Sequence, residues 1–283
     1  MFPKPIETWR PGLRRAYRAA VPAALLLWML PILAVIVTSL RGRDDLLRGN
    51  YWGWPTRWQL LDNYQAVFTQ SPMATYLANS LFLCLAVVTI TLVLASMAAF
   101  VLANYEFPGA RLLFLLMLAG NFLPAQLLMI PVRDIVVALG LFDTRWALIL
   151  VQVALGGPFA AFFLRNFIRD LPRELTEAAR CEGATEFQIY RRVVLPLLRP
   201  AMAALAVLIF TFVWNDYFWA LVLVQSDGVR PITIGLAQLK GAYSTQWNLV
   251  AAASILAAIP PIVLFFVMQK QFIAGLAMGA TKG

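Results

Sequence analysis

Six long hydrophobic runs constrain the fold of this chain more than any other feature of its sequence. The first extends from Ala19 to Leu40 without a charged residue. A helix needs roughly 20 apolar residues to cross about 30 Å of hydrocarbon, and these runs have about that length. The other five are Tyr76 to Asn104, Leu112 to Val132, Trp146 to Leu164, Met202 to Val224 and Leu249 to Met268. We therefore predict an all-α membrane protein with six transmembrane helices.

The composition supports this class and excludes several others. Hydrophobic residues make up 61% of the 283 residues and charged residues 13%, whereas soluble proteins carry about 25% charged residues. The chain has no His, the side chain most often used in metal sites and catalytic triads. Because Cys84 and Cys181 are also far apart in the sequence, we expect no metal site, disulfide or catalytic site. We attribute the net charge of +9 to membrane topology and expect no nucleic-acid partner.

The distribution of basic residues predicts which segments face the cytoplasm. With both termini inside, the inner segments hold 15 Lys and Arg and the outer segments 8, and cytoplasmic loops carry the excess of such residues. Four Arg between residues 41 and 57 oppose this bias, although three Asp lie beside them. We predict a cytoplasmic N-terminal segment at 1–18, a six-helix domain at 19–269 and a cytoplasmic C-terminal tail at 270–283.

Residues 165–200 interrupt the hydrophobic chain with a highly charged segment. It holds 7 Arg and 5 acids, and it lies between the fourth and fifth predicted spans. Ala178 and Ala179 leave a low surface beside the long acidic side chain of Glu177, which suits the close approach of another protein's backbone. The alternative is an amphipathic helix on the membrane surface. The acids among the Arg favour a docking element.

Local signals within this segment predict two short helices. Asp170 is placed to cap the first helix, and Gly183 is placed to end it in the left-handed conformation. Thr185 and Gln188 have the spacing of a capping box that starts the second helix, and we expect Pro196 to end it. The chain should therefore bend at Gly183.

The motif in this segment resembles that of a known family. Glu177-Ala178-Ala179 is followed, after three residues, by Gly183 and, after nine more, by Val193-Val194-Leu195-Pro196. The pattern resembles the EAA loop in the permease subunits of binding-protein-dependent ABC importers, with Val193, Glu182 and Cys181 as mild departures. Flanking sequences resemble the carbohydrate class, in particular the smaller permease subunit of the maltose transporter type; they include Asn63-Tyr64, Asn79-Ser80, Trp214-Asn215-Asp216 and the ending from Gln271 to Gly283.

The resemblance implies a division of labour among several subunits. This chain would be a multi-pass permease of the bacterial inner membrane, with a second, homologous permease subunit, two ATPase subunits and an extracytoplasmic binding protein as partners. The sequence has no phosphate-binding Gly-x-x-x-x-Gly-Lys-Ser/Thr loop, so ATP and Mg²⁺ would be held by the ATPase subunits. The residues implied in ATPase coupling are Glu177, Ala178, Ala179, Gly183, Leu195 and Pro196.

A group of polar and aromatic residues near the end of the fifth run is a candidate substrate path. The candidates are Trp214, Asn215, Asp216, Tyr217 and Trp219. An ionisable residue in a membrane helix suggests a functional role, and aromatic faces with hydrogen-bonding groups suit a sugar. The alternative is that Asn215 and Asp216 hold neighbouring helices together through hydrogen bonds. Mono- and oligosaccharides, polyols, anionic sugar derivatives and glycerol phosphate all fit these residues.

Other readings of the chain stay open at this stage. Half of an ion-coupled secondary transporter is the alternative function, although the sequence shows no repeat and Asp216 is the clearest candidate acid within a span. By the resemblance, the loop from Ser226 to Lys240 would contact the binding protein; otherwise it is a plain solvated loop. Pro residues in the third and sixth runs should kink or locally open those helices.

Overall fold

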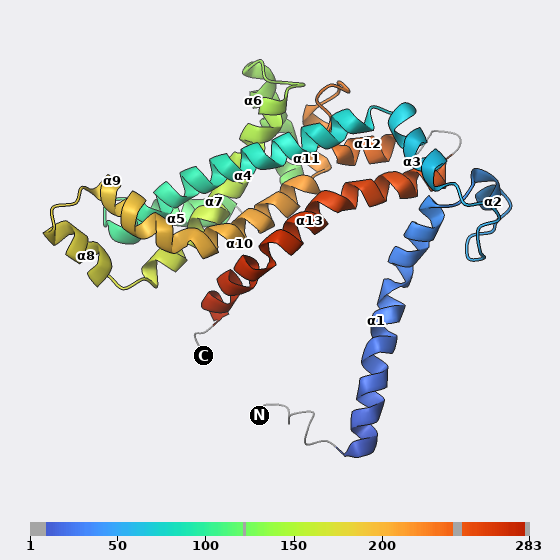
Figure 1. Ribbon diagram of the computed structural model, residues 1–283. Coiled ribbons are helices and arrows are strands. Elements are labelled where there is room, and N and C mark those ends of the chain that lie inside the picture. Colours follow the sequence, from blue (N-terminus) through green and yellow to red (C-terminus); the bar gives the residue numbers. More distant parts are fainter. Residues whose placement is uncertain (1–9, 121–122, 240–244, 281–283) are drawn as a thin grey trace. The chain divides into compact units, whose positions relative to one another are not determined.

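The computed structural model describes residues 10–120, 123–239 and 245–280, and these are largely helical (Figure 1). Five helical stretches are long and apolar enough to cross a membrane: residues 11–39, 73–104, 145–169, 186–214 and 247–270. The all-helical fold is thus confirmed, with five candidate spans among the described residues. The chain divides into two compact units, residues 1–71 with 239–256 and residues 72–238 with 257–283. Residues 1–9 and 281–283 of the two predicted terminal segments lie outside the described residues.

The first unit contains α1 (Pro11–Ser39), α2 (Arg43–Leu47), α3 (Leu60–Thr69) and the start of α13 (Trp247–Ala280). Most hydrophobic side chains of α1 are exposed, and Trp28 is 81% exposed. A helix that is hydrophobic all round and exposed in this way is suited to contact lipid. Its structure therefore agrees with the first predicted span.

Buried polar groups organise the connection between α1 and α3. The guanidinium of Arg41 is 1% exposed and donates hydrogen bonds to the backbone carbonyls of Asn50 and Gly53. Asp45 accepts hydrogen bonds from the backbone and the hydroxyl of Thr56, at 2.8 and 2.6 Å. These Thr56 contacts lower the pKa of Asp45 below its ordinary value. The connection has defined anchors even though it contains little regular structure.

Asn63 of α3 connects three parts of the first unit. Its amide nitrogen donates to the backbone carbonyls of Ser39 and Arg41, at 2.9 and 2.8 Å. Its amide oxygen accepts from the side chain of Asn248 at 2.8 Å. Because all three contacts are buried, Asn63 fixes α3 against the end of α1 and the start of α13.

The second unit is built around α4 (Met73–Asn104), α7 (Arg145–Arg169) and α10 (Leu195–Trp214). Small residues are buried where these helices pack, and small residues allow membrane helices to approach closely. They include Ala95 and Ala99 of α4, Ala160 and Ala161 of α7, and Ala201 and Ala204 of α10. Cys84 is buried in the same core, with its Sγ 3.8 Å from the carbonyl oxygen of Phe210.

For the third hydrophobic run, Leu112 to Val132, we predicted one helix. This prediction was wrong. The run is divided among α5 (Ala110–Gly120), the 3₁₀ segment η2 (Ala125–Leu128) and α6 (Met129–Ala138), and residues 121–122 lie outside the described residues. Pro124 accounts for part of the interruption, since proline disfavours the helical conformation of the residue before it. Pro131, by contrast, falls in the first turn of α6, where its missing N–H is tolerated.

The fifth run is also shorter than predicted, and its end is broken. Helix α10 stops at Trp214, and a separate helix, α11 (Phe218–Leu223), follows three residues later. The prediction of a single helix from Met202 to Val224 was therefore wrong. Asn215, Asp216 and Tyr217 lie in the break, where freed backbone groups take side-chain partners.

Candidate coupling segment, groove and outer loop

The charged segment contains α8 (Glu174–Cys181), and the predicted end of this helix is confirmed. Gly183 has a φ of 81°, in the left-handed region that favours glycine. Its N–H donates to the carbonyl of Arg180 and the N–H of Ala184 donates to that of Ala179, both at 3.0 Å. This pair of bonds is the Schellman motif, which reverses the chain direction while satisfying the last carbonyls of the helix.

The start of α8 differs from the prediction. Asp170 does not cap this helix, because α7 continues to Arg169 and Asp170 lies at the C-terminal end of α7. Helix α8 begins at Glu174, with Arg173 in the N-cap position. Arginine has no side-chain oxygen, so Arg173 cannot accept a capping hydrogen bond. The polar signal at Asp170 was assigned to the wrong helix end.

The second predicted helix starts as expected but does not end at Pro196. Thr185 and Gln188 form a complete capping box. The backbone N–H of Gln188 donates to Thr185 Oγ1 at 3.4 Å, and the backbone N–H of Thr185 donates to Gln188 Oε1 at 2.8 Å. Helix α9 (Glu186–Ile189) then continues through the π-helical segment η3 (Tyr190–Val194) into α10. A π-helical turn lengthens the hydrogen-bond ring, which accommodates the proline that an α-helix would not.

Side-chain contacts hold the charged segment together and join it to α4. Arg180 forms an ion pair with Glu186, with Nε 2.8 Å from Oε1, and this partner raises the pKa of Arg180. The Tyr190 hydroxyl lies 2.9 Å from the Ser96 hydroxyl of α4, and its ring contacts Phe100 at 5.6 Å between centroids. The segment is thus fixed to a membrane-spanning helix.

The predicted coupling residues occupy two different settings. Glu177, Ala178 and Gly183 are exposed and Ala179 is half-buried, on or just beyond α8. Leu195 and Pro196 are also half-buried but lie at the start of α10, beyond the π-helical segment. The exposed part of α8 is therefore the surface that a soluble partner can reach, whereas Leu195 and Pro196 belong to the helix that carries the segment.

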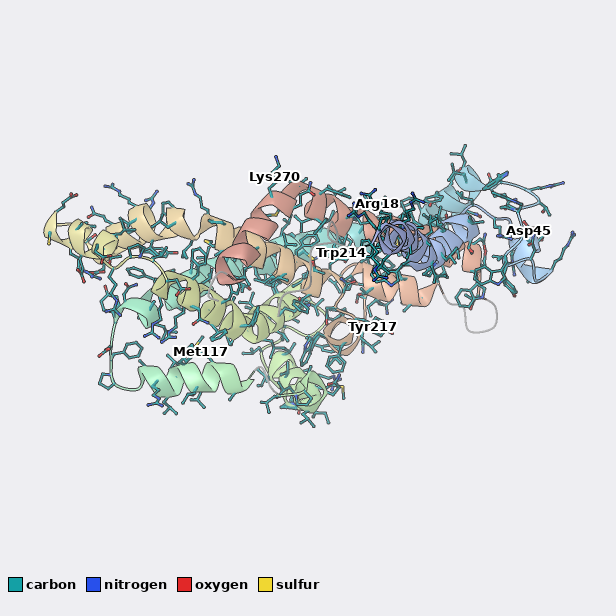
Figure 2. All side chains as sticks on the ribbon, turned by 90° about the horizontal axis from the view of Figure 1, so that it is seen from below. Arg18, Asp45, Met117, Trp214, Tyr217 and Lys270 are labelled. Atoms are coloured by element: carbon teal, nitrogen blue, oxygen red, sulfur yellow. The ribbon has the colours of Figure 1, made fainter. Side chains whose placement is uncertain are left out.

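The candidate substrate residues are only partly brought together. A groove of about 540 Å³ is lined by Asp216 and Trp219, together with Gln152, Phe159 and Phe212 among others. Trp214 instead is 4% exposed and donates its Nε1–H to the Ala257 carbonyl at 3.0 Å. Asn215 and Tyr217 are exposed and do not line the groove. Trp214 and Tyr217 are labelled in Figure 2.

Asp216 caps the short helix that follows it. Its carboxylate accepts from the backbone N–H of Trp219 and Ala220, at 3.3 and 3.2 Å, and from the amide nitrogen of Gln152 at 3.2 Å. Its backbone carbonyl accepts from the Thr233 hydroxyl at 2.7 Å. Asn215, in contrast, donates to the Thr211 carbonyl of its own helix at 2.8 Å. Asp216 therefore connects neighbouring helices. The contact of Asn215 stays within its own helix, so it is not the interhelical hydrogen bond of the alternative prediction.

Gln152 was not predicted as a site residue, although it is a polar residue in the fourth hydrophobic run. Its nitrogen points to Asp216, and its buried Oε1 has no hydrogen-bond partner in the part of the chain that the structure describes. The carboxylate fixes this orientation, because a flipped amide would place two acceptors together. This unpaired acceptor is buried beside the groove, so a hydroxyl group in the groove reaches it only if the lining shifts.

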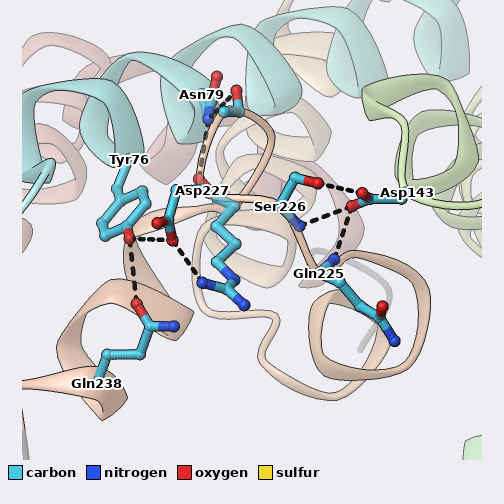
Figure 3. Close-up of polar contacts among 9 residues, drawn as sticks. Tyr76, Asn79, Asp143, Gln225, Ser226, Asp227 and Gln238 are labelled. Atoms are coloured by element: carbon cyan, nitrogen blue, oxygen red, sulfur yellow. Dashed lines mark hydrogen bonds and ion pairs between the residues drawn. The ribbon is translucent and has the colours of Figure 1, made fainter.

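The loop after α11 is anchored to α4 (Figure 3). Tyr76 has its hydroxyl 2.7 Å from Asp227 Oδ1 and 3.1 Å from Gln238 Oε1. Asn79 donates to the carbonyls of Gly228 and Arg230, both at 3.0 Å. The hydrogen bond from Tyr76 and the neighbouring Arg230 lower the pKa of Asp227 below its ordinary value. The segment predicted as a loop from Ser226 to Lys240 contains helix α12 (Ile232–Gln238), and Lys240 lies outside the described residues. The irregular part before α12 is held by several contacts, which a plain solvated loop does not require.

Asp143 anchors the other end of the same loop. Its carboxylate accepts hydrogen bonds from the backbone N–H of Gln225 and Ser226, at 2.7 and 2.9 Å, and from the Ser226 hydroxyl (Figure 3). Burial raises the pKa of Asp143, but the bonds from Ser226 and Gln225 lower it by more, so the pKa lies below its ordinary value. One signal in the sequence could have found the α4 anchors, since Tyr76 and Asn79 are three residues apart on one helix face.

Comparison with known proteins places this geometry in context. Residues 91–277 match the family described as binding-protein-dependent transport system inner membrane component. The chain is 35% identical to the arabinooligosaccharides transport system permease protein AraQ of Halalkalibacterium halodurans, over 89% of this chain and 91% of that protein. It is 34% identical to the trehalose transport system permease protein SugB of Mycobacterium tuberculosis, over 96% of this chain and 100% of that protein.

A solved structure has the same fold. A chain of a bacterial ABC transporter involved in the import of the acidic polysaccharide alginate superposes with a TM-score of 0.80. The match covers 93% of this chain and 99% of that chain, at 24% sequence identity. The fold of this chain thus has a close counterpart among solved structures.

Proposed function

Because this chain belongs to the family of binding-protein-dependent transport system inner membrane components, we propose that it forms half of the membrane path of an ATP-driven sugar importer. Permeases of this family have no ATPase domain of their own, and hydrolysis takes place in partner subunits. The observation that carries the proposal is the exposed helix α8, which ends in a Schellman turn and is fixed to α4 through Tyr190.

The α8 surface is the proposed contact with the ATPase. Glu177 and Ala178 present a carboxylate beside a small side chain, and both are exposed. A charge pair at such an interface contributes orientation, and truncating one partner of a buried pair costs about 2 to 5 kcal/mol. Movement of the ATPase would pass through α8 and the Tyr190 contact to α4, a continuous membrane helix. Gly183, Leu195 and Pro196 would shape the segment rather than contact the partner.

A sugar is the proposed substrate, for two reasons. The relatives named above are permeases for arabinooligosaccharides and trehalose. The groove combines the aromatic faces of Trp219, Phe159 and Phe212 with the free acceptor of Gln152, and buried polar groups require hydrogen-bond partners. A small shift of the groove lining would let a sugar hydroxyl donate to Gln152 while the aromatic rings cover the apolar face of the sugar. This proposal assigns no contact with the sugar to Trp214, Asn215 or Tyr217, because they do not line the groove.

The remaining architecture follows from the family and the sequence together. We place both termini and residues 165–200 in the cytoplasm, as the basic residues indicate. The α5 to α6 segment would complete a sixth crossing, and a second permease subunit would close the path opposite the groove. Two ATPase subunits would hold ATP and Mg²⁺, and an extracytoplasmic binding protein would deliver the sugar near the loop at 224–231. An ion-coupled secondary transporter would need none of these ATPase contacts.

A charge reversal on α8 tests this function. Glu177→Lys in the purified complex should weaken ATPase association by roughly 30-fold or more, as a loss of about 2 kcal/mol implies. Uptake and substrate-stimulated ATP hydrolysis in proteoliposomes should fall with it. Glu182→Lys is the matched control, because it makes the same charge change on an exposed residue five positions away, on another side of the helix.

The outcomes separate coupling from folding. Both variants should insert and purify in equal amounts, because neither changes a spanning segment. Unchanged association and ATP-dependent uptake in Glu177→Lys would refute the coupling role of α8. Uptake that persists without the ATPase and depends on an ion gradient would instead support the secondary-transporter alternative.

A further inference from the structure

A second cavity lies at the end of unit two that carries α8. Its volume is about 710 Å³, and it is lined by residues at the end of α4, in the connection to α5, at the start of α5, at the end of α7 and in α8. It is separate from the groove at Asp216, with which it shares no lining residue. Glu177, which the proposed function assigns to the ATPase contact, lines this cavity, but that function assigns no ligand to the cavity itself.

Arginine dominates the charged lining of this cavity. Five Arg side chains face it, against two carboxylates, those of Glu106 and Glu177; the five are Arg111, Arg165, Arg169, Arg173 and Arg180. Arg180 is already paired with Glu186. In the part of the chain that the structure describes, no ion pair involves Arg169 or Arg173, and both are exposed. The cavity therefore has an excess of positive charge that its own residues do not neutralise.

One arginine is held in a fixed position inside this lining. The Nε of Arg165 donates to the Leu102 carbonyl at 3.0 Å, and its guanidinium lies 4.2 Å from the centroid of the Phe114 ring. Arg169 is one helical turn further along α7, and the two charges repel each other. A structure that keeps like charges together in a cavity gains stability when an anion lies between them.

The position of the cavity indicates which class of anion it can bind. Arg165 and Arg169 stand at the end of α7, and Leu102 stands near the end of α4, both of which are candidate membrane spans. Leu102, Phe107 and Phe114 give the cavity an apolar side. Basic pockets between the ends of membrane helices bind lipid headgroups, and guanidinium groups match phosphate oxygens in a bidentate manner.

We propose that this arginine cavity binds a phosphate group, supplied by the headgroup of an anionic phospholipid at the membrane surface. The phosphate would lie between Arg165, Arg169 and Arg173, and the acyl chains would follow the apolar side. Free phosphate shares the same chemistry but lacks the apolar part. An acidic side chain of a partner subunit would satisfy the charges from outside without using Phe114.

Lipid titration of the full chain, purified with its partner subunits and delipidated, tests this proposal. Native mass spectrometry would count the bound lipids, with phosphatidylglycerol, phosphatidylcholine and inorganic phosphate as separate probes. The double variant Arg169→Gln/Arg173→Gln removes two exposed charges of the cavity and leaves the packed Arg165 in place. Arg191→Gln/Arg192→Gln is the matched control, because it removes two exposed Arg charges of the same segment outside the cavity.

We expect one saturable phosphatidylglycerol site, weakened about 30-fold in the cavity variant, at roughly 1 kcal/mol per charge near the surface. The control should retain the site, and phosphatidylcholine should not compete. Saturable binding of inorganic phosphate but not of phosphatidylglycerol would support a phosphate site and would overturn its assignment to a lipid headgroup. Equal losses in both double variants, or no saturable binding, would overturn the proposal. Weakened subunit association without any phosphate binding would overturn it in favour of a protein contact.

Discussion

Replacement of Gly183 by valine tests the coupling segment at a point where only backbone conformation is at stake. Gly183 has a φ of 81°, and no atom lies within 4 Å of the position that a Cβ would take. A Cβ there meets no steric obstacle, so we attribute the expected effect to the left-handed backbone. That conformation costs an L-residue roughly 1 to 2 kcal/mol, and more for a β-branched residue. The Schellman turn should therefore lose about 5- to 30-fold in relative population.

The matched variant is Gly183→Asn, because asparagine tolerates the left-handed region and commonly ends helices in this way. Substrate-stimulated ATP hydrolysis and uptake in proteoliposomes should fall in Gly183→Val and stay near the parent level in Gly183→Asn. The thermal stability of both should be similar, since α8 lies outside the buried core. Equal activity of the valine and asparagine variants would refute the role of this turn in coupling.

Three further predictions concern topology, the groove and the outer loop. In a Cys84→Ala background, a membrane-impermeant maleimide should label Cys181 only after cell disruption, and labelling of intact cells would contradict the cytoplasmic placement. Gln152→Leu should lower apparent sugar affinity by about 1 to 3 kcal/mol without loss of assembly, measured by uptake, and unchanged affinity would remove the hydroxyl contact. Gly235→Ala would place its Cβ 2.2 Å from the Tyr76 ring, so it should lower the melting temperature.

Local rules were sufficient to predict the caps of the charged segment. Gly183 and the pair Thr185 and Gln188 act within one turn of the chain, so the signal and the structure involve the same few residues. The same local logic failed at Asp170 and Pro196. Asp170 has the chemistry of an N-cap, but the length of α7 is set by its packing on α4. A widened turn before Pro196 keeps the helix continuous where an α-helical rule predicts its end.

The broken spans and the outer-loop anchors needed information that hydrophobic runs do not contain. A run measures how apolar a segment is, whereas the break at Asn215 depends on Asp216 capping the next helix and bonding Gln152 of α7. Asp143 and Ser226 are far apart in the sequence, and neither stands out by composition. Their pairing is created only when α6, α7 and α11 are in place. Long-range polar contacts of this kind are absent from any window of the sequence.

Helix α4 connects the two surfaces to which the proposed function assigns partners. Ser96, near one end, contacts Tyr190 of the charged segment, and Tyr76 and Asn79, near the other, hold the loop at 224–231. At about 1.5 Å per residue, the stretch from Tyr76 to Ser96 is roughly 30 Å long, which is close to the thickness of the hydrocarbon layer. A continuous helix of this length moves largely as one body. Under the proposed function, a displacement of the charged segment would therefore be transmitted to the loop by the same element that spans the membrane, without an intervening hinge.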